Sequence, residues 1–491
     1  MADEKKIAPT VDAEEKQITT KSDSELSTKS ISEDEGQELT WTEEEEKALV
    51  KKVDFLVLPI LMLAFFALQL DRGNIGNALT DFFLQEVGIT QYQFNVGQQL
   101  LSAGIVLLEI PSNIILYRVG PTLWLGGQIL AWGLVATFQA FQKGLGPYLA
   151  TRLLLGLCES GFIPAGLYTI TRWYKREETS RRFSLYFLGC YLAVGSSSLI
   201  AYGILHMRGI CGLGGWQWLF LLEGLFTVLV GLIFLALFPK STAHPVSLLG
   251  LRYFNEREAQ ILTQRVLRDD PTKFQPRRNV SLAEVKAAFS NWRILPHCLT
   301  TILGMAPAQA LGAYAPSLVV SFGFDRLKSN AMISIGSWIT FLMNIVFGFG
   351  ADWTGYRGLW VLGGVLLSWG FTLGDRLVIG SGNRDLRFAL LIMTVGFSSP
   401  WHATNGSWMA LNARSAGERS ITMAFFVMGA NIAGIVGGQI FQAKDAPLYY
   451  TGWTVIMALI SLSLCMAITA NLQYRILNKV QKRTGTDRYT Y

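Results

Sequence analysis

About twelve apolar stretches, each long enough to cross a lipid bilayer, dominate this sequence. A membrane-spanning helix needs about 20 mainly apolar residues. Stretches that meet this criterion lie at approximately 53–71, 94–117, 121–141, 147–171, 183–206, 216–238, 296–320, 329–350, 358–376, 386–411, 420–442 and 450–473. Only 16% of the 491 residues are charged, whereas soluble proteins carry about a quarter. The sequence therefore predicts an all-α membrane protein with twelve transmembrane helices in two six-helix bundles.

Polar segments divide the chain into five regions. Residues 1–52 are polar and acidic, and such a segment cannot bury enough apolar surface to fold alone. Six spans occupy 53–238 and six occupy 296–474, with the polar segment 239–295 between them and a basic tail at 475–491. We expect a disordered acidic tail, two bundles arranged as structural repeats, and a connecting loop.

The distribution of Lys and Arg predicts the orientation in the membrane. Basic residues gather at 172–182, in the central loop and in the C-terminal tail, and loops on the opposite side hold fewer. Since cytoplasmic loops carry the excess of Lys and Arg, both termini and the central loop are expected in the cytoplasm. The plasma membrane is the expected location. Within the central loop, the pattern at 255–268 predicts a short surface helix.

Composition argues against several kinds of partner. The net charge is only +6 and the basic residues form no single patch, so nucleic-acid binding is not expected. Five scattered cysteines show neither metal-ligand spacing nor a disulfide framework. We expect no metal and no cofactor.

Arg152 and Glu159 are ionisable residues within the stretch 147–171. Seven residues make about two helical turns, so both side chains lie on one face. An ionisable group in an apolar span costs several kcal/mol unless it is paired or hydrated, and is a functional hypothesis by default. Arg152 could attract an anion and Glu159, near mid-membrane, could carry a proton. The alternative is a buried structural ion pair.

Three further candidates lie in other spans of the first half. Arg72 follows Asp71 at the end of the first span and could attract an anion at the mouth of a central cavity. Alternatively, the two residues form an interfacial charge pair that ends the helix, with Arg72 reaching water. Glu109 and Glu223, in the second and sixth spans, are each either an additional proton site or a hydrogen-bonding group between helices.

The second half offers amides rather than charges within its spans. Asn405 and Asn431 are the candidates for substrate binding there, because an amide can both donate and accept hydrogen bonds. The other polar groups in these spans are Gln309, Asn344, His402, Asn412 and Gln439.

A glycine-rich loop follows the eighth span and predicts a conformational latch. It reads Gly348-Phe-Gly-Ala-Asp352-Trp-Thr-Gly355-Tyr-Arg357. The glycines permit a tight turn, and Asp352 could accept hydrogen bonds from a neighbouring helix N-terminus or pair with a loop arginine. Arg118 occupies the corresponding loop of the first half.

This loop resembles the signature G-x-x-x-D-R-x-G-R of the major facilitator superfamily. Trp353 stands where the signature has Arg, and Tyr117 stands where the first-half loop usually has Asp. The resemblance implies the major facilitator fold and transport by alternating access.

A second resemblance, over about residues 50–475, is to fungal anion:cation symporters of the allantoate permease type. The motifs that carry it are Leu70-Asp71-Arg72-x-Asn74-x2-Asn77-Ala78, Glu109-x-Pro111-Ser-Asn113, Arg152-x3-Gly156-x2-Glu159-x-Gly161-x2-Pro164, Trp173-Tyr174, Gly215-Trp216-x-Trp218-x4-Glu223-Gly224, Ser407-Trp408-x3-Asn412, Ala430-Asn431-x2-Gly434-x2-Gly437-x-Gln439 and Ala446-Pro447-x-Tyr449. The segment around Asn431 is similar to the alternative-sulfate and thiamine-pathway branch. Ser415 and Glu418 depart from the Gly and Lys of many members.

The family implies uptake of small anions together with protons: carboxylates, vitamins, dipeptide-like compounds or sulfur oxyanions. The hypothesis is therefore a monomeric, proton-coupled importer of a small organic or sulfur-containing anion in a lipid bilayer. Efflux of an acidic metabolite or drug is the alternative within transporters, and a non-transporting nutrient sensor is the alternative of another class. An enzyme is not expected, because the four histidines form no cluster with carboxylates or cysteines.

Overall fold

The computed structural model describes residues 40–269, 292–412 and 416–484. Within these ranges the chain is helical, and the one β feature is an isolated bridge between Val246 and Arg252. The predicted all-α class is confirmed. The chain divides into two compact units, Met1–Lys51 and Lys52–Tyr491, and the second holds all the helices discussed below except the start of α2.

The helices of the first half follow one another with short connections. They are α2 (Glu43–Ala78), η1 (Leu79–Asp81), α3 (Phe83–Val87), α4 (Gln91–Val119), α5 (Pro121–Phe138), η2 (Gln139–Phe141), α6 (Leu145–Glu159), α7 (Phe162–Trp173), α8 (Arg176–Leu205), η3 (Ile210–Gly212) and α9 (Gly215–Leu237).

The central segment contains α10 (Glu256–Asp269), which confirms the surface helix predicted at 255–268. The second half comprises η5 (Trp292–Ile294), α12 (Leu295–Ser321), α13 (Lys328–Thr354), α14 (Arg357–Val378), α15 (Arg384–Phe397), α16 (Pro400–Leu411), α17 (Ala416–Gly437), η6 (Ala443–Asp445) and α18 (Tyr450–Thr484).

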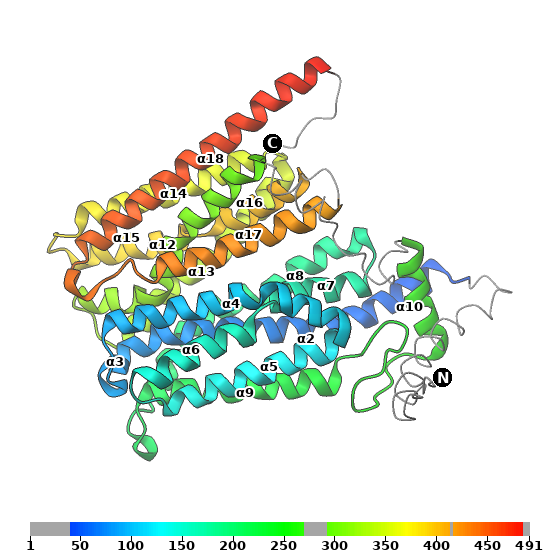
Figure 1. Cartoon of the computed structure of the whole chain (residues 1–491), viewed down its shortest axis with the longest axis horizontal. Coiled ribbons are helices and arrows are strands. Elements are labelled where there is room, and N and C mark those ends of the chain that lie inside the picture. The colour runs from blue at the N-terminus through cyan, green and yellow to red at the C-terminus, as the bar shows by residue number, and fades with distance from the viewer. Residues whose placement is uncertain (1–39, 270–291, 413–415, 485–491) are drawn as a thin grey trace, which may run out of the picture. The chain divides into compact units, whose positions relative to one another are not determined.

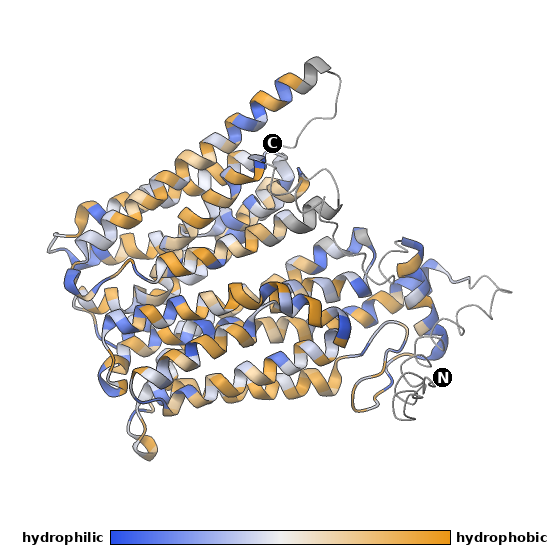
Figure 2. Cartoon of the chain, viewed as in Figure 1, coloured by the Kyte–Doolittle hydropathy of each residue, from blue (hydrophilic) through white to orange (hydrophobic). Residues whose placement is uncertain are grey.

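Nine helices among the described residues are long and apolar enough to cross a membrane. The predicted spans 121–141, 386–411 and 420–442 are also helical, as α5, α15 with α16, and α17, but fall outside that set. Figure 2 shows apolar residues along most of the helices, with hydrophilic residues gathered on α10 and at helix ends. This pattern suits helices surrounded by lipid.

Two groups of helices pack as bundles (Figure 1). In the first, α5 packs against α9 and α6, and α4 packs against α6; in the second, α12 packs against α17 and α18, and α14 packs against α15 and α18. Small residues allow the closest approaches: a Cβ added to Gly156 of α6 would lie 2.2 Å from the carbonyl oxygen of Leu101 on α4. Close backbone contact of this kind is typical of membrane helices.

The bundles touch mainly through α8 with α13 and α4 with α17. We call the end that carries α10 the α10 end, and the end that carries η1, η3 and η6 the η1 end. Among the described residues, the hydrogen bonds and ion pairs that join the bundles lie toward the η1 end. The pairs are Asn95–Phe441, Gln91–Phe441, Gln99–Ile435, Gln99–Gln439, Tyr314–Asn95, Asn330–Thr80 and Arg326–Asp81.

Two helices extend beyond the limits predicted for them. The first span was expected at 53–71, but α2 already begins at Glu43. Thr42 and Glu45 exchange hydrogen bonds at its start, and acidic residues of the first turn favour a helix N-terminus. The prediction of a disordered tail to residue 52 is therefore wrong for residues 43–52. At the other end of the chain, α18 continues to Thr484, so the tail predicted from 475 is helical at its start.

Candidate functional site

The side chains of Arg72 and Glu159 form an ion pair between α2 and α6. The Arg72 Nε donates to Glu159 Oε2 at 2.6 Å. The Glu159 side chain is fully buried, whereas a quarter of the Arg72 side chain is exposed. The other Glu159 oxygen, Oε1, has no hydrogen-bond partner among the described residues. The structure thus brings together two residues that the sequence singled out in different spans.

Arg152 lies two turns before Glu159 on the same helix and is almost completely buried. Its exposed fraction is 1%, and its Nε and Nη2 have no hydrogen-bond partner in the described part of the chain. Its guanidinium carbon is 5.9 Å from the centroid of the Tyr148 ring. A buried guanidinium with unused donors is costly, so Arg152 stays a candidate for binding an anion.

A break in the fourth span separates α6 from α7 at Ser160 and Gly161. Gly161 has a φ of +76°, which a side chain would disfavour. Its amide donates to Glu109 Oε2 of α4 at 3.0 Å. The Ser160 hydroxyl donates to the Ile105 carbonyl at 2.7 Å. In this conformation Glu109 therefore accepts a hydrogen bond at the start of α7. Of the two roles considered for Glu109, this contact corresponds to the hydrogen bond between helices and not to the proton site.

Asp71 and Glu223 are both buried in the first bundle. Asp71 was placed at the end of a helix as part of an interfacial pair, but α2 continues to Ala78 and Asp71 is only 3% exposed. The burial of Asp71 thus argues against the interfacial charge pair, which was one of the two alternatives. Its Oδ2 accepts a hydrogen bond from the Thr227 hydroxyl of α9 at 2.9 Å. Glu223, one turn earlier on α9, has two carboxylate oxygens without hydrogen-bond partners in the described residues.

Arg72 and Asn431 flank the contact between the bundles. A Cβ on Gly76 would lie 2.6 Å from the Gly312 carbonyl of α12, and Arg72 is one turn from Gly76 on the same face of α2. A Cβ on Gly434 of α17 would likewise meet Ser102 of α4, and Asn431 lies near Gly434 on one face. Both side chains therefore belong to helix faces that turn toward the opposite bundle.

Asn405 is bonded entirely within the second bundle. Its amide nitrogen donates to the His297 carbonyl and to Thr301 Oγ1, both at 3.1 Å. Its oxygen lies 2.7 Å from His297 Nδ1. These contacts tie α16 to α12, and in this conformation they occupy the amide that was expected to bind substrate.

The predicted latch residues form a compact turn between α13 and α14. The Arg357 guanidinium donates to the Asp352 carboxylate, and Gly355 has a φ of +71°. Gly348 has open space around its Cβ position, whereas a Cβ on Gly350 would overlap the Trp360 ring. Gly350 is thus the glycine that close packing requires. Arg118 is exposed and has no ion-pair partner among the described residues.

A charge cluster at the η1 end was not anticipated. The carboxylate of Asp81, fully buried, lies 2.8 Å from Arg208 of the first bundle and 3.2 Å from Arg326 of the second. Glu86 accepts hydrogen bonds from Arg208 and from the Trp216 indole. The four charged residues sit outside the predicted spans and no motif marks them, so only the fold shows that they meet.

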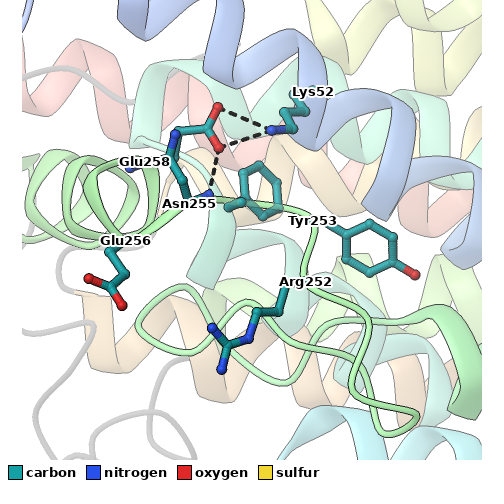
Figure 3. Close-up of a pocket in the computed structure, with 7 residues that line it drawn as sticks. Lys52, Arg252, Tyr253, Asn255, Glu256 and Glu258 are labelled. Carbon is teal, nitrogen blue, oxygen red and sulfur yellow. Dashed lines mark hydrogen bonds and ion pairs between the residues drawn. The ribbon is translucent and has the colours of Figure 1, made fainter.

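A cavity of about 510 Å³ lies at the α10 end (Figure 3). Its lining consists of Lys52, Arg252, Tyr253, Phe254, Asn255, Glu256 and Glu258. Lys52 of α2 reaches both carboxylate oxygens of Glu258 on α10, at 2.9 and 3.1 Å. With Arg265 of α10 bonded to Glu178, these contacts fasten α10 to the first bundle.

Several predicted features lie outside the described residues. Ser415 is among them, and so are residues 1–39, 270–291 and 485–491. The side chain of Glu418 is likewise not described.

Comparison of the sequence with known families gives one match, to the Major Facilitator Superfamily over residues 61–438. An uncharacterised transporter of Saccharomyces cerevisiae is 28% identical over 458 residues, which cover 91% of this chain and 83% of the yeast protein. A protein of Agrobacterium vitis, whose name assigns it provisionally to tartrate transport, is 26% identical over 85% of this chain and 90% of its own length.

Solved structures of transporters share the fold. A bacterial homologue of the human lysosomal transporter Spinster, in an inward-facing and unoccupied conformation, superposes with a TM-score of 0.65 at 12% identity, covering 88% of this chain and 96% of its own. A D-xylose–proton symporter gives the same TM-score and identity, covering 84% and 97%. At these identities the likeness concerns the fold.

Proposed function

Because the chain belongs to the major facilitator superfamily, we propose that it imports a small organic or sulfur-containing anion together with protons, by alternating access. The transporter class follows from the family and the fold, and a multi-pass membrane location follows from the apolar helices. The anion, the proton and the direction are the proposal. Its main support is Arg152, a nearly fully buried arginine with unused guanidinium donors.

Two arginines and one carboxylate would form the substrate site. Arg152 supplies donors for a carboxylate, sulfonate or sulfate group, since a guanidinium matches the planar or tetrahedral oxygens of such anions. Arg72 is already paired with Glu159, so an arriving anion would compete with Glu159 for this cation. Asn431, on the opposite bundle, would supply a hydrogen bond once the substrate bridges the two halves.

Proton coupling would follow from that competition. When the anion takes Arg72, the buried Glu159 loses its counter-ion, and binding of a proton removes the cost of its charge. Anion and proton binding would thus be linked, and linkage is reciprocal. A membrane potential negative inside opposes the entry of an anion, and each proton moved with it removes one unit of that opposition. Glu109 would substitute only if its hydrogen bond to Gly161 is released.

In the proposed orientation the α10 end faces the cytoplasm. The bundles are joined at the η1 end, so the described conformation would be closed to the outside. The name of the similar Spinster homologue structure, inward-facing and unoccupied, fits this assignment. The Asp352–Arg357 pair would act as a latch of the second bundle at its cytoplasmic side, where Gly355 forms the turn. Arg118 lies in the corresponding loop of the first bundle.

A transport assay in a transporter-deficient yeast host tests the proposal. Labelled tartrate, a sulfonate and sulfate serve as probes of the two anion classes, at acid and neutral external pH, with and without a protonophore. We expect accumulation of one class, faster at acid pH and abolished by the protonophore. Arg152→Ala should abolish it at unchanged surface expression, and Arg152→Lys should rescue it in part. Accumulation of no anion, or protonophore-insensitive accumulation, would contradict the proposal.

A further inference from the structure

Asp71 and Glu223 face each other across α2 and α9. The Thr227 hydroxyl of α9 donates to Asp71 Oδ2 at 2.9 Å. Asn74 follows Asp71 by three residues on α2, and Glu223 precedes Thr227 by four on α9, so each pair shares one face of its helix. The contact through Thr227 therefore brings the Asp71 and Asn74 face of α2 against the Glu223 and Thr227 face of α9.

Several polar atoms in this contact are buried and unused. Asp71 Oδ1, both Glu223 oxygens and both amide atoms of Asn74 have no hydrogen-bond partner in the described part of the chain. The Trp132 indole nitrogen of α5 is unused as well. Asn74 is 1% exposed and Trp132 is fully buried. Asn74 lies next to Glu223, and Trp132 lies next to Asp71. The protonation of the two carboxyl groups therefore decides how these buried polar atoms can pair.

No cation balances these carboxyl groups. Neither has a Lys or Arg nitrogen within ion-pairing distance among the described residues. In the described part of the chain, a further charged group, Glu159, lies near Asp71 and is paired with Arg72. Two adjacent carboxylates without a cation repel each other, and each buried charge costs several kcal/mol. One proton shared between them removes the repulsion and one of the two buried charges, and the neutral acid can donate a hydrogen bond to the remaining carboxylate.

We propose that Asp71 and Glu223 hold one proton between them, at a site separate from the substrate-binding arginines. Consecutive residues on a helix point about 100° apart, which is why Asp71 meets α9 while Arg72 meets Glu159. The shared proton itself does not depend on the proposed function. Only its consequence, that a second proton can move with the anion, rests on that function. Asp71 and Glu223 belong to the same bundle, so the site would persist while the bundles move against each other.

Proton binding at the Asp71–Glu223 site is controlled differently from proton binding at Glu159. Glu159 exchanges a cation for a proton when the substrate arrives. The Asp71–Glu223 site has no cation to exchange, so its occupancy depends on access to water and on the charge of Glu159. Ionisation of Glu159 would favour a proton at Asp71. Protonation of Glu159 would favour release of the proton held by Asp71 and Glu223.

Infrared difference spectroscopy tests the site without any substrate. The purified full-length protein in lipid nanodiscs is recorded across a pH series, in wild type, Asp71→Asn, Glu223→Gln and the double variant. We expect the wild type to retain a carboxylic-acid carbonyl signal at neutral pH that the double variant loses. In either single variant the remaining acid should give up its proton at lower pH than the pair does, because its charged neighbour is gone. Asp385→Asn, an exposed carboxylate, is the matched control and should leave the spectrum unchanged.

A further variant keeps the test decisive if the double variant fails to fold. Thr227→Val retains both acids and removes the hydrogen bond to Asp71, so it should shift the frequency of the same signal. An identical carbonyl signal in wild type and double variant, or no shift in Thr227→Val, would overturn the inference. Loss of the signal on replacing choline by sodium would also overturn it, since the site would then bind a metal cation. Failure of anion uptake with this signal intact would instead count against the proposed function alone.

Discussion

Arg326 of the second bundle lies 3.2 Å from the buried carboxylate of Asp81 in the first, and this is the ion pair that joins the two bundles among the described residues. The Arg326 guanidinium also lies over the Phe82 ring, 4.0 Å from its centroid. Asp81 has a second cation, Arg208 of the same bundle, at 2.8 Å. Opening of the η1 end would therefore break the contact to Arg326, together with the hydrogen bonds that join the bundles there, and would leave Arg208 as the partner of the buried carboxylate.

Removing Arg326 should favour opening of the η1 end. A partly exposed ion pair contributes up to about 1 kcal/mol, which corresponds to about a fivefold change in the open-to-closed ratio. A cysteine at Ser102, buried where α4 meets α17, reports the opening through its rate of labelling in a cysteine-free background. We expect Arg326→Ala to raise that rate about fivefold. Arg384→Ala, which removes an exposed arginine that pairs with its neighbour Asp385 and lies over the Phe324 ring of the same bundle, should not change it.

Close packing of α4 against α6 should depend on Gly156. A Cβ at Gly156 would lie 2.2 Å from the Leu101 carbonyl oxygen, whereas a Cβ at Gly146, on the same helix, meets nothing within 4 Å. Overpacking of this kind costs about 1–3 kcal/mol. Gly156→Ala should therefore lower the melting temperature of the purified protein, followed by intrinsic fluorescence, and Gly146→Ala should leave it nearly unchanged. Equal melting temperatures would contradict the helix contact.

Much of this arrangement could be predicted from the sequence, because lipid imposes long apolar helices and a fixed helical period. The helical spans, the surface helix α10 and the shared face of Arg152 and Glu159 follow from these two constraints. The pairing of Arg72 with Glu159 could not be predicted, because it joins residues 87 positions apart and depends on how the helices pack.

The same limit applies to Asp71 and Asn405. Asp71 was assigned to the helix end because the apolar run stops there, but α2 continues through a polar segment that α9 covers. Asn405 was assigned to the substrate because it is a polar group in an apolar span. Its partners, His297 and Thr301, are on another helix and become evident only in the fold. Sequence alone identifies costly polar groups, whereas the fold shows what satisfies each of them.

The orientation can be tested with single cysteines. Ser30→Cys and Gln260→Cys, placed in the predicted cytoplasmic regions, should react with an impermeant thiol reagent only after the cells are permeabilised. Cys211 is native, exposed and part of η3 at the opposite end, so it should react in intact cells and is the internal control. Labelling of either engineered cysteine in intact cells would contradict the proposed orientation.

Asp352→Asn should slow transport without unfolding the protein. The Asp352 side chain is 72% exposed, so its replacement should change stability by less than about 0.5 kcal/mol. Loss of the pair with Arg357 should shift the equilibrium between the two conformations. Arg357→Ala should slow uptake to a similar degree, and the double variant should be no slower than either single variant if the two residues act as a unit. Additive effects would indicate separate roles.

The coupling role of Glu159 can be separated from substrate binding by one substitution. Glu159→Gln keeps the shape of the side chain and mimics its protonated state, so Arg72 is released from its 2.6 Å ion pair and is free to bind the anion. In reconstituted vesicles the variant should still exchange internal for external substrate, because exchange needs no net movement of protons. It should lose concentrative uptake driven by a pH gradient, and its remaining exchange should no longer depend on external acid. Arg152→Ala should lose exchange as well, since it removes the anion site itself. If Glu159→Gln still accumulates substrate against a gradient as fast as wild type, the Arg72–Glu159 pair is structural. The driving proton must then be carried by another buried carboxyl group of the first bundle.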